Sequence, residues 1–267
     1  MRIELYKEMP VAPSGKSEDN FMPYLDTFLL EGASTPLGAV LILPGGGYTH
    51  RAIHEGDPVA KTFNKFGFHA FTLQYRVEPY CYPAAQMDAI RAIKIIRANA
   101  AKWRVDPDKI AIGGFSAGGH LAACAGLLHD KINPVNGDEA DAVSGRPDAM
   151  ILCYGVLSVT KTYTERNINC YEGTPYRDEN GKDINPCELV TPDTPPAYVW
   201  HSADDGSVPS ACSFKFAEAM NQAGVSCNLH VFPHAPHGKG LAISHNDICK
   251  WPEEAAQFLK LWCGFPG

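Results

Sequence analysis

The sequence has no apolar run long enough to cross a bilayer, and acidic residues interrupt its first eight positions, where a secretory signal would be apolar. It also has no cluster or stripe of basic residues, and its net charge is -7. Nucleic-acid binding needs a basic footprint, and membrane insertion needs a long apolar segment. We therefore expect a cytoplasmic protein that binds neither nucleic acid nor membrane.

The nine cysteines include no Cys-x-x-Cys pair, and their number is odd. Scattered cysteines of this kind indicate reduced thiols rather than a disulfide framework. The segment Pro44-Gly45-Gly46-Gly47 lacks the Lys-Ser/Thr ending of a phosphate-binding loop, and the spaced glycines of a dinucleotide fingerprint do not follow it. We predict no metal ion and no cofactor.

Length and composition favour one folded domain over residues 1–267. A chain of 267 residues with 45% hydrophobic and 20% charged residues suits one large α/β domain rather than a disordered or fibrous protein. We find no internal repeat and no low-complexity tract, so the order of periodic segments is the main guide to architecture.

Strand-like and helix-like segments alternate along the chain. Short apolar runs predict strands at 38–43, 68–75, 109–115, 149–154, 197–201 and 226–232. Apolar residues at helical spacing predict helices at 54–66, 84–103, 117–128, 210–223 and 251–262, and Asp106-Pro107-Asp108 predicts a turn. This alternation is typical of a three-layer α/β sandwich, with helices on both faces of a mostly parallel central sheet.

Residues 155–196 interrupt the alternation, because they are polar, rich in Tyr, Asn, Asp and Pro, and only weakly periodic. We interpret them as an insertion with at most short helices that can form a cap over the site. Tyr163, Tyr171 and Tyr176 within it are compatible with stacking on sugar rings, although exposed tyrosines in a polar loop need no ligand to explain them.

The strand predicted at 109–115 and the helix predicted at 117–128 meet at Ser116, within Gly113-Gly114-Phe115-Ser116-Ala117-Gly118-Gly119. A Gly-x-Ser-x-Gly turn in this position exposes a serine hydroxyl above the sheet, and small neighbours make the sharp turn sterically possible. The alternative is a serine in an ordinary glycine-rich turn. The flanking elements favour a nucleophile, so we predict that Ser116 is catalytic.

A serine hydroxyl is a weak nucleophile, so a histidine must take its proton and a carboxylate must orient that histidine. Both are expected downstream of the serine, with the acid first. Asp204 and Asp205 follow the strand predicted at 197–201, and Asp205 is favoured because its spacing to Val208-Pro209 is the usual one in hydrolases of this fold. Asp204 is the alternative acid, or else a helix cap or loop brace.

Two histidines, His234 and His237, follow the strand predicted at 226–232. His237 is favoured as the base because the glycine after it permits a tight turn that places the imidazole over the serine. His120 is expected to pack in its helix. His50 and His54 are candidates to line the pocket, but the interpretation as surface residues is preferred.

The tetrahedral intermediate of ester cleavage carries an oxyanion, which needs preorganised backbone N–H donors. One donor is expected from Ala117, directly after the nucleophile, and the others from the glycine-rich loop after Leu43. Gly46 and Gly47 are the candidates in that loop.

Several segments together carry a family resemblance: Pro44-Gly45-Gly46-Gly47-Tyr48, Tyr75-Arg76-Val77, Asp106-Pro107-Asp108-Lys109-Ile110, the turn around Ser116, 195–201 leading to Asp204-Asp205, and Pro236-His237-Gly238. Over most of its length the chain resembles bacterial α/β-hydrolase esterases related to the hormone-sensitive-lipase group, particularly acetyl-xylan, feruloyl or sugar esterases. The resemblance implies a triad of Ser116, Asp205 and His237 and an oxyanion hole of Gly46, Gly47 and Ala117. Pro44 is a departure, because those lipase relatives often have His there.

These observations predict a serine carboxylesterase that hydrolyses short-chain esters through a covalent acyl-enzyme. The resemblance implies that the substrates are acetyl esters of sugars or xylo-oligosaccharides, so the expected partner is a small-molecule ester. A homo-oligomer is a further possible assembly. One alternative is a serine peptidase of the prolyl-peptidase type, although no added propeller domain or amine-binding acidic cluster is apparent. Another is a non-catalytic ligand receptor on a hydrolase scaffold.

Overall fold

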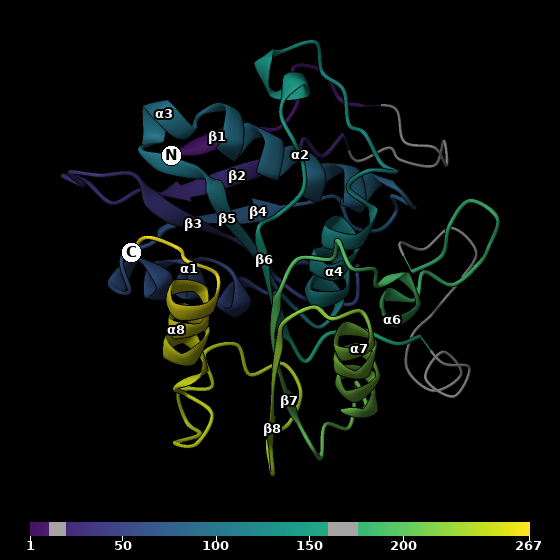
Figure 1. The fold of residues 1–267 in the computed structure, drawn as a ribbon. Helices are drawn as coiled ribbons and strands as arrows, with labels where there is room; N and C mark the ends of the chain where they lie inside the picture. Colours follow the sequence, from purple (N-terminus) through teal and green to yellow (C-terminus); the bar gives the residue numbers. More distant parts are fainter. Residues whose placement is uncertain (11–19, 160–175) are drawn as a thin grey trace.

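The computed structural model describes residues 1–10, 20–159 and 176–267 (Figure 1). Its strands are β1 (Arg2–Glu4), β2 (Tyr24–Phe28), β3 (Leu37–Leu43), β4 (His69–Gln74), β5 (Val105–Phe115), β6 (Ala149–Cys153), β7 (Ala197–Ser202) and β8 (Cys227–Phe232). Its helices are η1 (Ile53–Glu55), α1 (Asp57–Lys65), α2 (Ala84–Ala98), α3 (Ala100–Trp103), α4 (Ala117–Leu128), η2 (Glu139–Ala142), α6 (Pro186–Leu189), α7 (Ala211–Gln222) and α8 (Trp251–Trp262).

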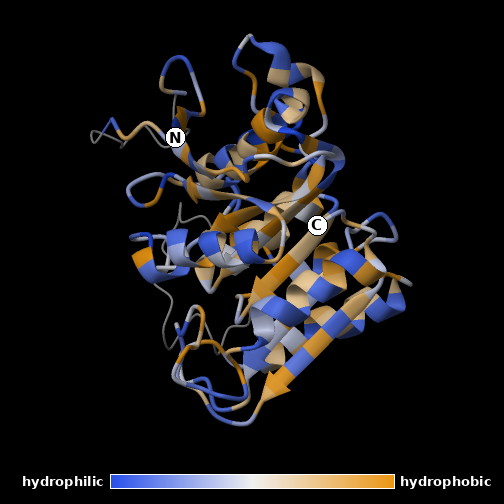
Figure 2. Cartoon of the chain, turned by 90° about the vertical axis from the view of Figure 1, so that its left-hand side faces the viewer, coloured by the Kyte–Doolittle hydropathy of each residue, from blue (hydrophilic) through white to orange (hydrophobic). Residues whose placement is uncertain are grey.

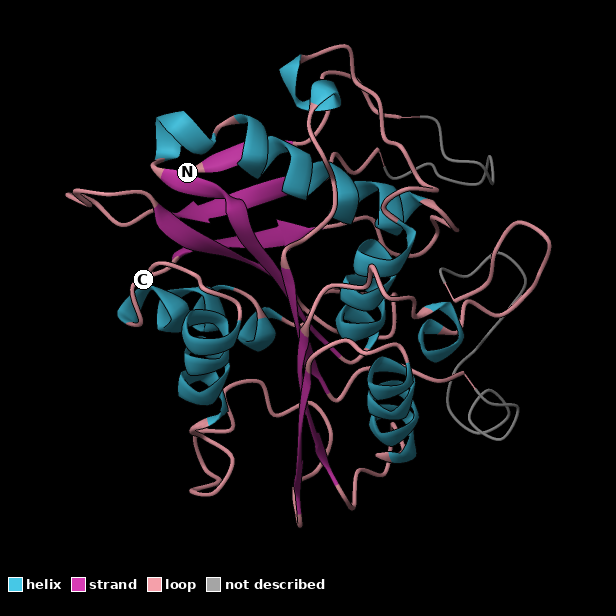
Figure 3. Ribbon diagram, viewed as in Figure 1, coloured by secondary structure: helices cyan, strands magenta, loops and turns pink. Residues whose placement is uncertain are grey.

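The strands form one eight-stranded sheet in the order β1-β2-β4-β3-β5-β6-β7-β8 (Figure 3). The pairs β1/β2 and β2/β4 are antiparallel, and the strands from β4 to β8 are parallel. The chain leaves β3 toward β4 on one side and later returns to β5 on the other. Ligands bind at such a reversal, beyond the carboxyl ends of the parallel strands.

Two layers of helices cover the sheet, with α1 and α8 on one face and α2, α4 and α7 on the other (Figure 1). Alternate residues of β3 divide between them, since Leu41 packs in the core under α2 and α4 whereas Val40 and Ile42 pack under α1 and α8. Figure 2 shows hydrophobic residues concentrated on the strands and mixed with hydrophilic residues on the helices. The predicted fold class, a three-layer sandwich around a mostly parallel sheet, is confirmed.

The turn predicted at Asp106-Pro107-Asp108 was wrong as a boundary, because β5 continues through it. Leu37 of β3 pairs with Val105, and Ala39, only two residues later, pairs with Ile110. The residues between Val105 and Ile110 therefore bulge away from β3, and Pro107 has no N–H to give to the sheet. The turn-forming residues Asp106, Pro107 and Asp108 thus lie in an irregular part of β5 and do not precede the strand.

The single helix predicted over 84–103 was also wrong, because it divides into α2 and α3 at Asn99. The Asn99 backbone N–H and its side-chain amide both donate to the Ile95 carbonyl, at 3.1 and 2.9 Å. A side chain that competes for the same carbonyl as the backbone favours a helix end.

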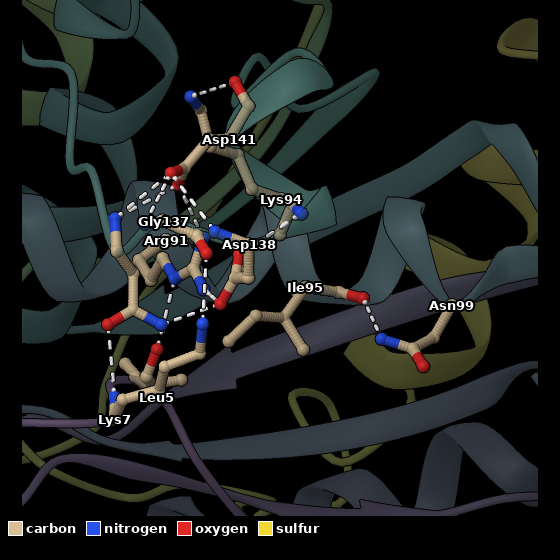
Figure 4. A network of polar contacts seen from close by, with 11 residues as sticks. Leu5, Lys7, Arg91, Lys94, Ile95, Asn99, Gly137, Asp138 and Asp141 are labelled. Carbon is tan, nitrogen blue, oxygen red and sulfur yellow. Dashed lines mark hydrogen bonds and ion pairs between the residues drawn. The ribbon is translucent and has the colours of Figure 1, made fainter.

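The amino-terminal strands β1 and β2 were not anticipated from the sequence. A network around Arg91 of α2 secures the chain after β1 (Figure 4). The Arg91 guanidinium donates to the Leu5 carbonyl at 3.0 Å, forms an ion pair with Asp141 at 3.0 Å, and forms another with Asp138. These bonds join the first strand, α2 and η2, so the antiparallel edge of the sheet is tied to the helical layer.

The described part of the insertion predicted at 155–196 contains one short helix, α6, which packs against α4 and α7. Tyr163 and Tyr171 lie outside the described residues. Tyr176 is described and is buried, with its ring 4.8 Å from the Tyr48 ring and 4.7 Å from the His120 ring. The expectation that Tyr176 is exposed was therefore wrong, and its ring packs on Tyr48 and His120.

Candidate active site

Ser116 lies between the last residue of β5 and the first residue of α4, with φ 52° and ψ -117°. A non-glycine residue with positive φ is strained and keeps this conformation only where the surrounding packing enforces it. At Ser116 the close packing occurs at the neighbouring glycines. A Cβ on Gly114 would lie 2.0 Å from the Gly118 carbonyl oxygen, and a Cβ on Gly118 would lie 2.2 Å from the Leu43 oxygen. Only glycine permits β5, α4 and the end of β3 to approach this closely, so the turn at Ser116 depends on these positions.

The structure brings Ser116, His237 and Asp205 into one hydrogen-bonded chain. His237 Nδ1 is 2.7 Å from Asp205 Oδ2, and His237 Nε2 is 2.8 Å from Ser116 Oγ. A carboxylate only accepts, so Nδ1 carries the proton and Nε2 is left to accept from the serine hydroxyl. The Asp205 side chain is 1% exposed and the His237 side chain is 20% exposed. The His237 imidazole is therefore reachable from solvent, while the Asp205 carboxylate is not.

Buried Asp205 has several donors besides His237. The backbone N–H groups of Ser207 and Val208 donate to Asp205 Oδ1 at 2.8 and 2.9 Å, and His201 Nε2 lies 3.4 Å from Oδ2. Burial alone would raise the pKa of Asp205, but the hydrogen bonds from His201 and His237 outweigh it and hold this pKa well below its ordinary value. The carboxylate facing His237 is thus kept charged.

Asp204, the alternative acid, points away from His237. Its carboxylate accepts from the Ser202 hydroxyl and from the Ala235 backbone N–H, both at 2.9 Å, and lies 3.1 Å from His234 Nδ1. The Ala235 bond is the main cause of its lowered pKa. Asp204 and His234 therefore connect the loop after β7 to the loop after β8, as a brace beside the Ser116 chain.

The glycine-rich loop after β3 is fixed against the turn at Ser116. Gly46 has φ 128°, and a Cβ there would lie 2.3 Å from the His50 oxygen. The Tyr75 hydroxyl donates to the Pro44 carbonyl at 2.6 Å. Within the described part of the chain, the backbone N–H groups of Gly46, Gly47 and Ala117 donate no hydrogen bond. Donors are thus available on both sides of Ser116.

His120 of α4 is fully buried, as the sequence predicted. Its Nε2 donates to the Ile184 carbonyl at 3.0 Å, so its Nδ1 accepts from the Tyr48 hydroxyl at 2.8 Å. Burial lowers the pKa of His120 to about 4. This neutral imidazole connects the glycine-rich loop, α4 and the described end of the insertion.

Sequence reasoning missed three buried side chains at the site: Glu55, Tyr154 and His201. The contacts of Tyr154 join residues far apart in the chain, since its partner Glu55 is 99 positions away. Those of His201, with Asp205, Val208 and Ser213, are closer in sequence. No motif or periodicity signals such a contact. His54 was interpreted as a surface residue, and its side chain is largely exposed, yet its Nε2 donates to the Gly238 carbonyl at 2.9 Å.

In the part of the chain that the structure describes, no group of three or more His, Cys, Asp or Glu side chains is arranged to hold a metal ion. No helix among these residues combines the length and the apolar character that crossing a membrane requires.

The fold, together with the comparisons, defines the class of the protein as an α/β hydrolase. The crystal structure of an acetyl ester-xyloside bifunctional hydrolase from Caldicellulosiruptor lactoaceticus is similar with a TM-score of 0.84 and 36% identity, over 100% of this chain and 97% of that one. Residues 25–220 match the BD-FAE family. The chain belongs to this family, and the predicted resemblance to sugar esterases of the α/β-hydrolase type is confirmed.

Two curated relatives extend well beyond this chain. An endo-1,4-beta-xylanase B of Butyrivibrio fibrisolvens is 32% identical over 226 residues, which cover 83% of this chain and 35% of the relative. An acetylxylan esterase of Xylanibacter ruminicola is 30% identical over 208 residues, which cover 76% of this chain and 41% of the relative. The chain thus spans less than half the length of either relative. The esterase names agree with the predicted class of carboxylic ester hydrolases.

Proposed function

We propose that the protein is a serine carboxylesterase that hydrolyses short-chain esters, in particular acetyl esters of sugars or xylo-oligosaccharides. The observation that carries this proposal is the hydrogen-bonded chain from Ser116 through His237 to Asp205. Among the described residues, the backbone N–H groups of Gly46 and Gly47, in the loop after β3, and of Ala117, directly after Ser116, donate no hydrogen bond. A nucleophile, a base, an acid and oxyanion donors are the complete set that acyl transfer needs.

Acylation begins when the Ser116 hydroxyl oxygen attacks the ester carbonyl carbon and His237 Nε2 takes the hydroxyl proton. The carbonyl oxygen becomes an oxyanion, stabilised by the N–H groups of Gly46, Gly47 and Ala117. Asp205 stabilises the imidazolium that forms. His237 then gives the proton to the alcohol oxygen, the C–O bond breaks, and the acyl group stays on Ser116.

Deacylation repeats these steps with water as the nucleophile. His237 takes a proton from water as the oxygen attacks the acyl carbon, and then returns a proton to Ser116 Oγ as the acyl bond breaks. The products are a carboxylic acid and the regenerated hydroxyl. The same histidine acts first as base and then as acid in each half of the cycle.

The proposed alcohol half of the substrate rests on the relatives. One is named an acetylxylan esterase and another an acetyl ester-xyloside bifunctional hydrolase. Because the pocket rather than the triad decides which ester enters, the substrate has to be tested separately from the mechanism.

Hydrolysis of p-nitrophenyl acetate tests the mechanism. Ser116→Ala should abolish turnover and labelling by a fluorophosphonate, whereas Ser226→Ala, an exposed serine, should keep both. Turnover retained by Ser116→Ala would remove Ser116 from the reaction. Absence of labelling in the unaltered protein would favour a receptor without an activated nucleophile.

Mass spectrometry of acetylated xylo-oligosaccharides tests the substrate. We expect products that have each lost an acetyl group, at a rate that Ser116→Ala reduces to background. Inertness toward every acetylated sugar, combined with turnover of p-nitrophenyl acetate, would leave a general esterase and reject the sugar proposal.

A further inference from the structure

The buried carboxylate of Glu55 lies between the two loops that carry the proposed oxyanion donors and the proposed base. Its side chain is 3% exposed. Oε2 accepts the Gly45 backbone N–H at 2.8 Å, and Oε1 accepts the Tyr154 hydroxyl at 2.7 Å. Each carboxylate oxygen therefore holds a different part of the site.

On one side, Glu55 fixes the peptide that precedes the oxyanion donors. A Cβ on Gly45 would lie 2.6 Å from the Phe115 oxygen, 2.7 Å from Glu55 Oε2 and 3.1 Å from Ser116 Cβ. The Gly45 backbone is thus enclosed between Glu55 and the turn of the nucleophile. Since its N–H is already bonded to Glu55, Gly45 is not an oxyanion donor, and its orientation sets the direction of the peptides that follow.

On the other side, Tyr154 carries the contact to the loop of the base. Its hydroxyl accepts the Gly240 N–H at 2.8 Å, and its ring lies edge-on to the His237 imidazole, with 5.0 Å between the ring centroids. Trp251 Nε1 donates to the Gly240 carbonyl at 3.0 Å. A path of hydrogen bonds therefore runs from Gly45 through Glu55 and Tyr154 to Gly240, three residues after the base.

A second contact joins the same two regions. His54, next to Glu55 in η1, donates from Nε2 to the carbonyl of Gly238, the residue directly after His237. The short helix η1 thus touches the loop of the base at Gly238 and, through Tyr154, at Gly240. Movement of this loop relative to the oxyanion loop would break both contacts.

We propose that Glu55 is a positioning residue that sets the distance and angle between the oxyanion donors and His237, a role that rests on the proposed esterase function. Both groups must reach the same tetrahedral centre at once, so a small relative displacement weakens transition-state stabilisation more than substrate binding. Glu55 acts through Gly45 and Tyr154 and has no step of its own in the reaction.

The chemistry of the contacts explains why a carboxylate stands here. Gly45 N–H and the Tyr154 hydroxyl both donate, and a carboxylate is the acceptor-only group that satisfies both. A glutamine of the same shape can still accept the Gly45 N–H through its carbonyl oxygen, but its NH2 then faces the Tyr154 hydroxyl. That hydrogen bond has to reverse, with the glutamine donating, and the Tyr154 hydroxyl proton loses its acceptor. Glu55→Gln therefore disturbs the connection between the loops with little change in volume.

The test compares Glu55→Gln and Tyr154→Phe with Tyr198→Phe as the matched control. Tyr198 is a buried tyrosine whose hydroxyl also donates to a carboxylate, that of Glu254 at 2.9 Å, but on the α8 side of β7. With p-nitrophenyl acetate, Glu55→Gln should lower kcat about tenfold to a hundredfold and change KM less than about threefold. Tyr198→Phe should change neither.

Two further measurements separate positioning from a loss of folded protein. Rates are normalised to active sites titrated with a fluorophosphonate, so that unfolded molecules do not count. Affinity for a trifluoromethyl ketone, which forms a tetrahedral adduct on serine, should fall by the same factor as kcat/KM. The double variant Glu55→Gln/Tyr154→Phe should have a kcat only slightly lower than that of Glu55→Gln alone. Both substitutions break the same path of hydrogen bonds from Gly45 to Gly240, so their effects on kcat are not additive.

Turnover per titrated site within about twofold of the unaltered protein in Glu55→Gln would overturn the positioning role. An equal fall in kcat in Tyr198→Phe would overturn it too, since any buried tyrosine–carboxylate hydrogen bond would then have the same effect on turnover. Ser116→Ala keeps the two proposals apart. If Ser116→Ala stays active, the serine mechanism fails, whereas an inactive Ser116→Ala beside a fully active Glu55→Gln rejects only the role of Glu55.

Discussion

Asp204 and Asp205 are adjacent carboxylates that bond in different directions from one loop. Asp205 turns inward to His237 and His201, and Asp204 turns outward to Ser202, His234 and Ala235. The two residues lie in the turn that follows β7, where the Asp205 backbone N–H donates to the Ser202 carbonyl at 3.3 Å, and their side chains leave this turn in different directions. The spacing argument from the sequence favoured Asp205, and the geometry supports the same choice.

Replacing each aspartate by asparagine should separate the two roles. Asp205→Asn should lower kcat about a thousandfold to ten-thousandfold, because the amide favours the wrong tautomer of His237. Asp204→Asn should keep kcat within about threefold, since the loop brace touches no reacting atom. Steady-state kinetics with p-nitrophenyl acetate measure both. A larger loss for Asp204→Asn than for Asp205→Asn would reverse the assignment.

Residue types and their order sufficed to select Ser116, Asp205 and His237 as candidates, because a strand-to-helix serine demands an acid and a base on later loops. They did not suffice for Glu55. Its partners Gly45 and Tyr154 are 10 and 99 positions away, and its role depends on which donors the folded chain happens to place around it. Contacts of this kind carry no sequence pattern.

At the scale of elements, the glycines of α4 differ sharply in what surrounds them. A Cβ on Gly118 would meet the backbone oxygens of Leu43 and Pro44, at 2.2 and 2.5 Å, which cannot move without shifting the glycine-rich loop after β3. A Cβ on Gly126 of the same helix would instead meet the flexible Met150 side chain, with Sδ at 2.6 Å. The same substitution should therefore have different consequences at the two positions.

Gly118→Ala should destabilise the protein by more than about 2 kcal/mol and abolish esterase activity, because it pushes α4 away from the loop after β3. Gly126→Ala should stay within about 1 kcal/mol, since the gain in helix propensity offsets the repacking of Met150. Urea unfolding and active-site titration measure the two effects. Equal stability of both variants would mean that the close approach at Gly118 is not required.

The buried His120 connects α4 to the glycine-rich loop and predicts a pH dependence of stability. Its pKa is about 4 in the folded chain, against an ordinary value of 6.5, because burial disfavours the charged form. As pH falls from 6.5 to 4, the unfolded chain takes up a proton that the folded chain refuses, so the free energy of unfolding decreases. The two pKa values correspond to a loss of about 3 kcal/mol, complete below about pH 4.

Urea unfolding between pH 4 and pH 7 tests this linkage. His120→Gln should flatten the dependence between pH 6.5 and pH 4, even if its stability at pH 7 is lower, because the titrating group is gone. His50→Gln, which replaces an exposed histidine, should leave the slope unchanged. An unaltered slope in His120→Gln would show that other groups cause the acid sensitivity.

At the scale of the molecule, the alternation of apolar segments predicted the parallel part of the sheet, because buried strands and the helices between them have different periods. It failed for β1 and β2, which have only three and five residues and are held by pairing at the edge rather than by a long apolar run. These short strands bury few apolar residues, and the hydrogen bond and ion pairs of Arg91 with Leu5, Asp138 and Asp141 add to their stability. The antiparallel edge is therefore stabilised by ionic contacts that the sequence pattern does not reveal.

Arg91→Met should test whether that network stabilises the whole molecule without serving the reaction. The Arg91 side chain is 1% exposed, while those of Asp138 and Asp141 are 29% and 22% exposed. Partial solvation of the two carboxylates reduces the cost of losing their partner, so we expect a loss of about 2 to 3 kcal/mol in urea unfolding. Arg177→Met, which removes the more exposed pair with Asp183, should cost about 0.5 kcal/mol.

The same Arg91→Met variant should keep its activity, because Arg91 contacts neither Ser116 nor the loops around it. We expect kcat per titrated site to stay unchanged in the folded variant. A fall in kcat would show that the edge of the sheet and the site are coupled.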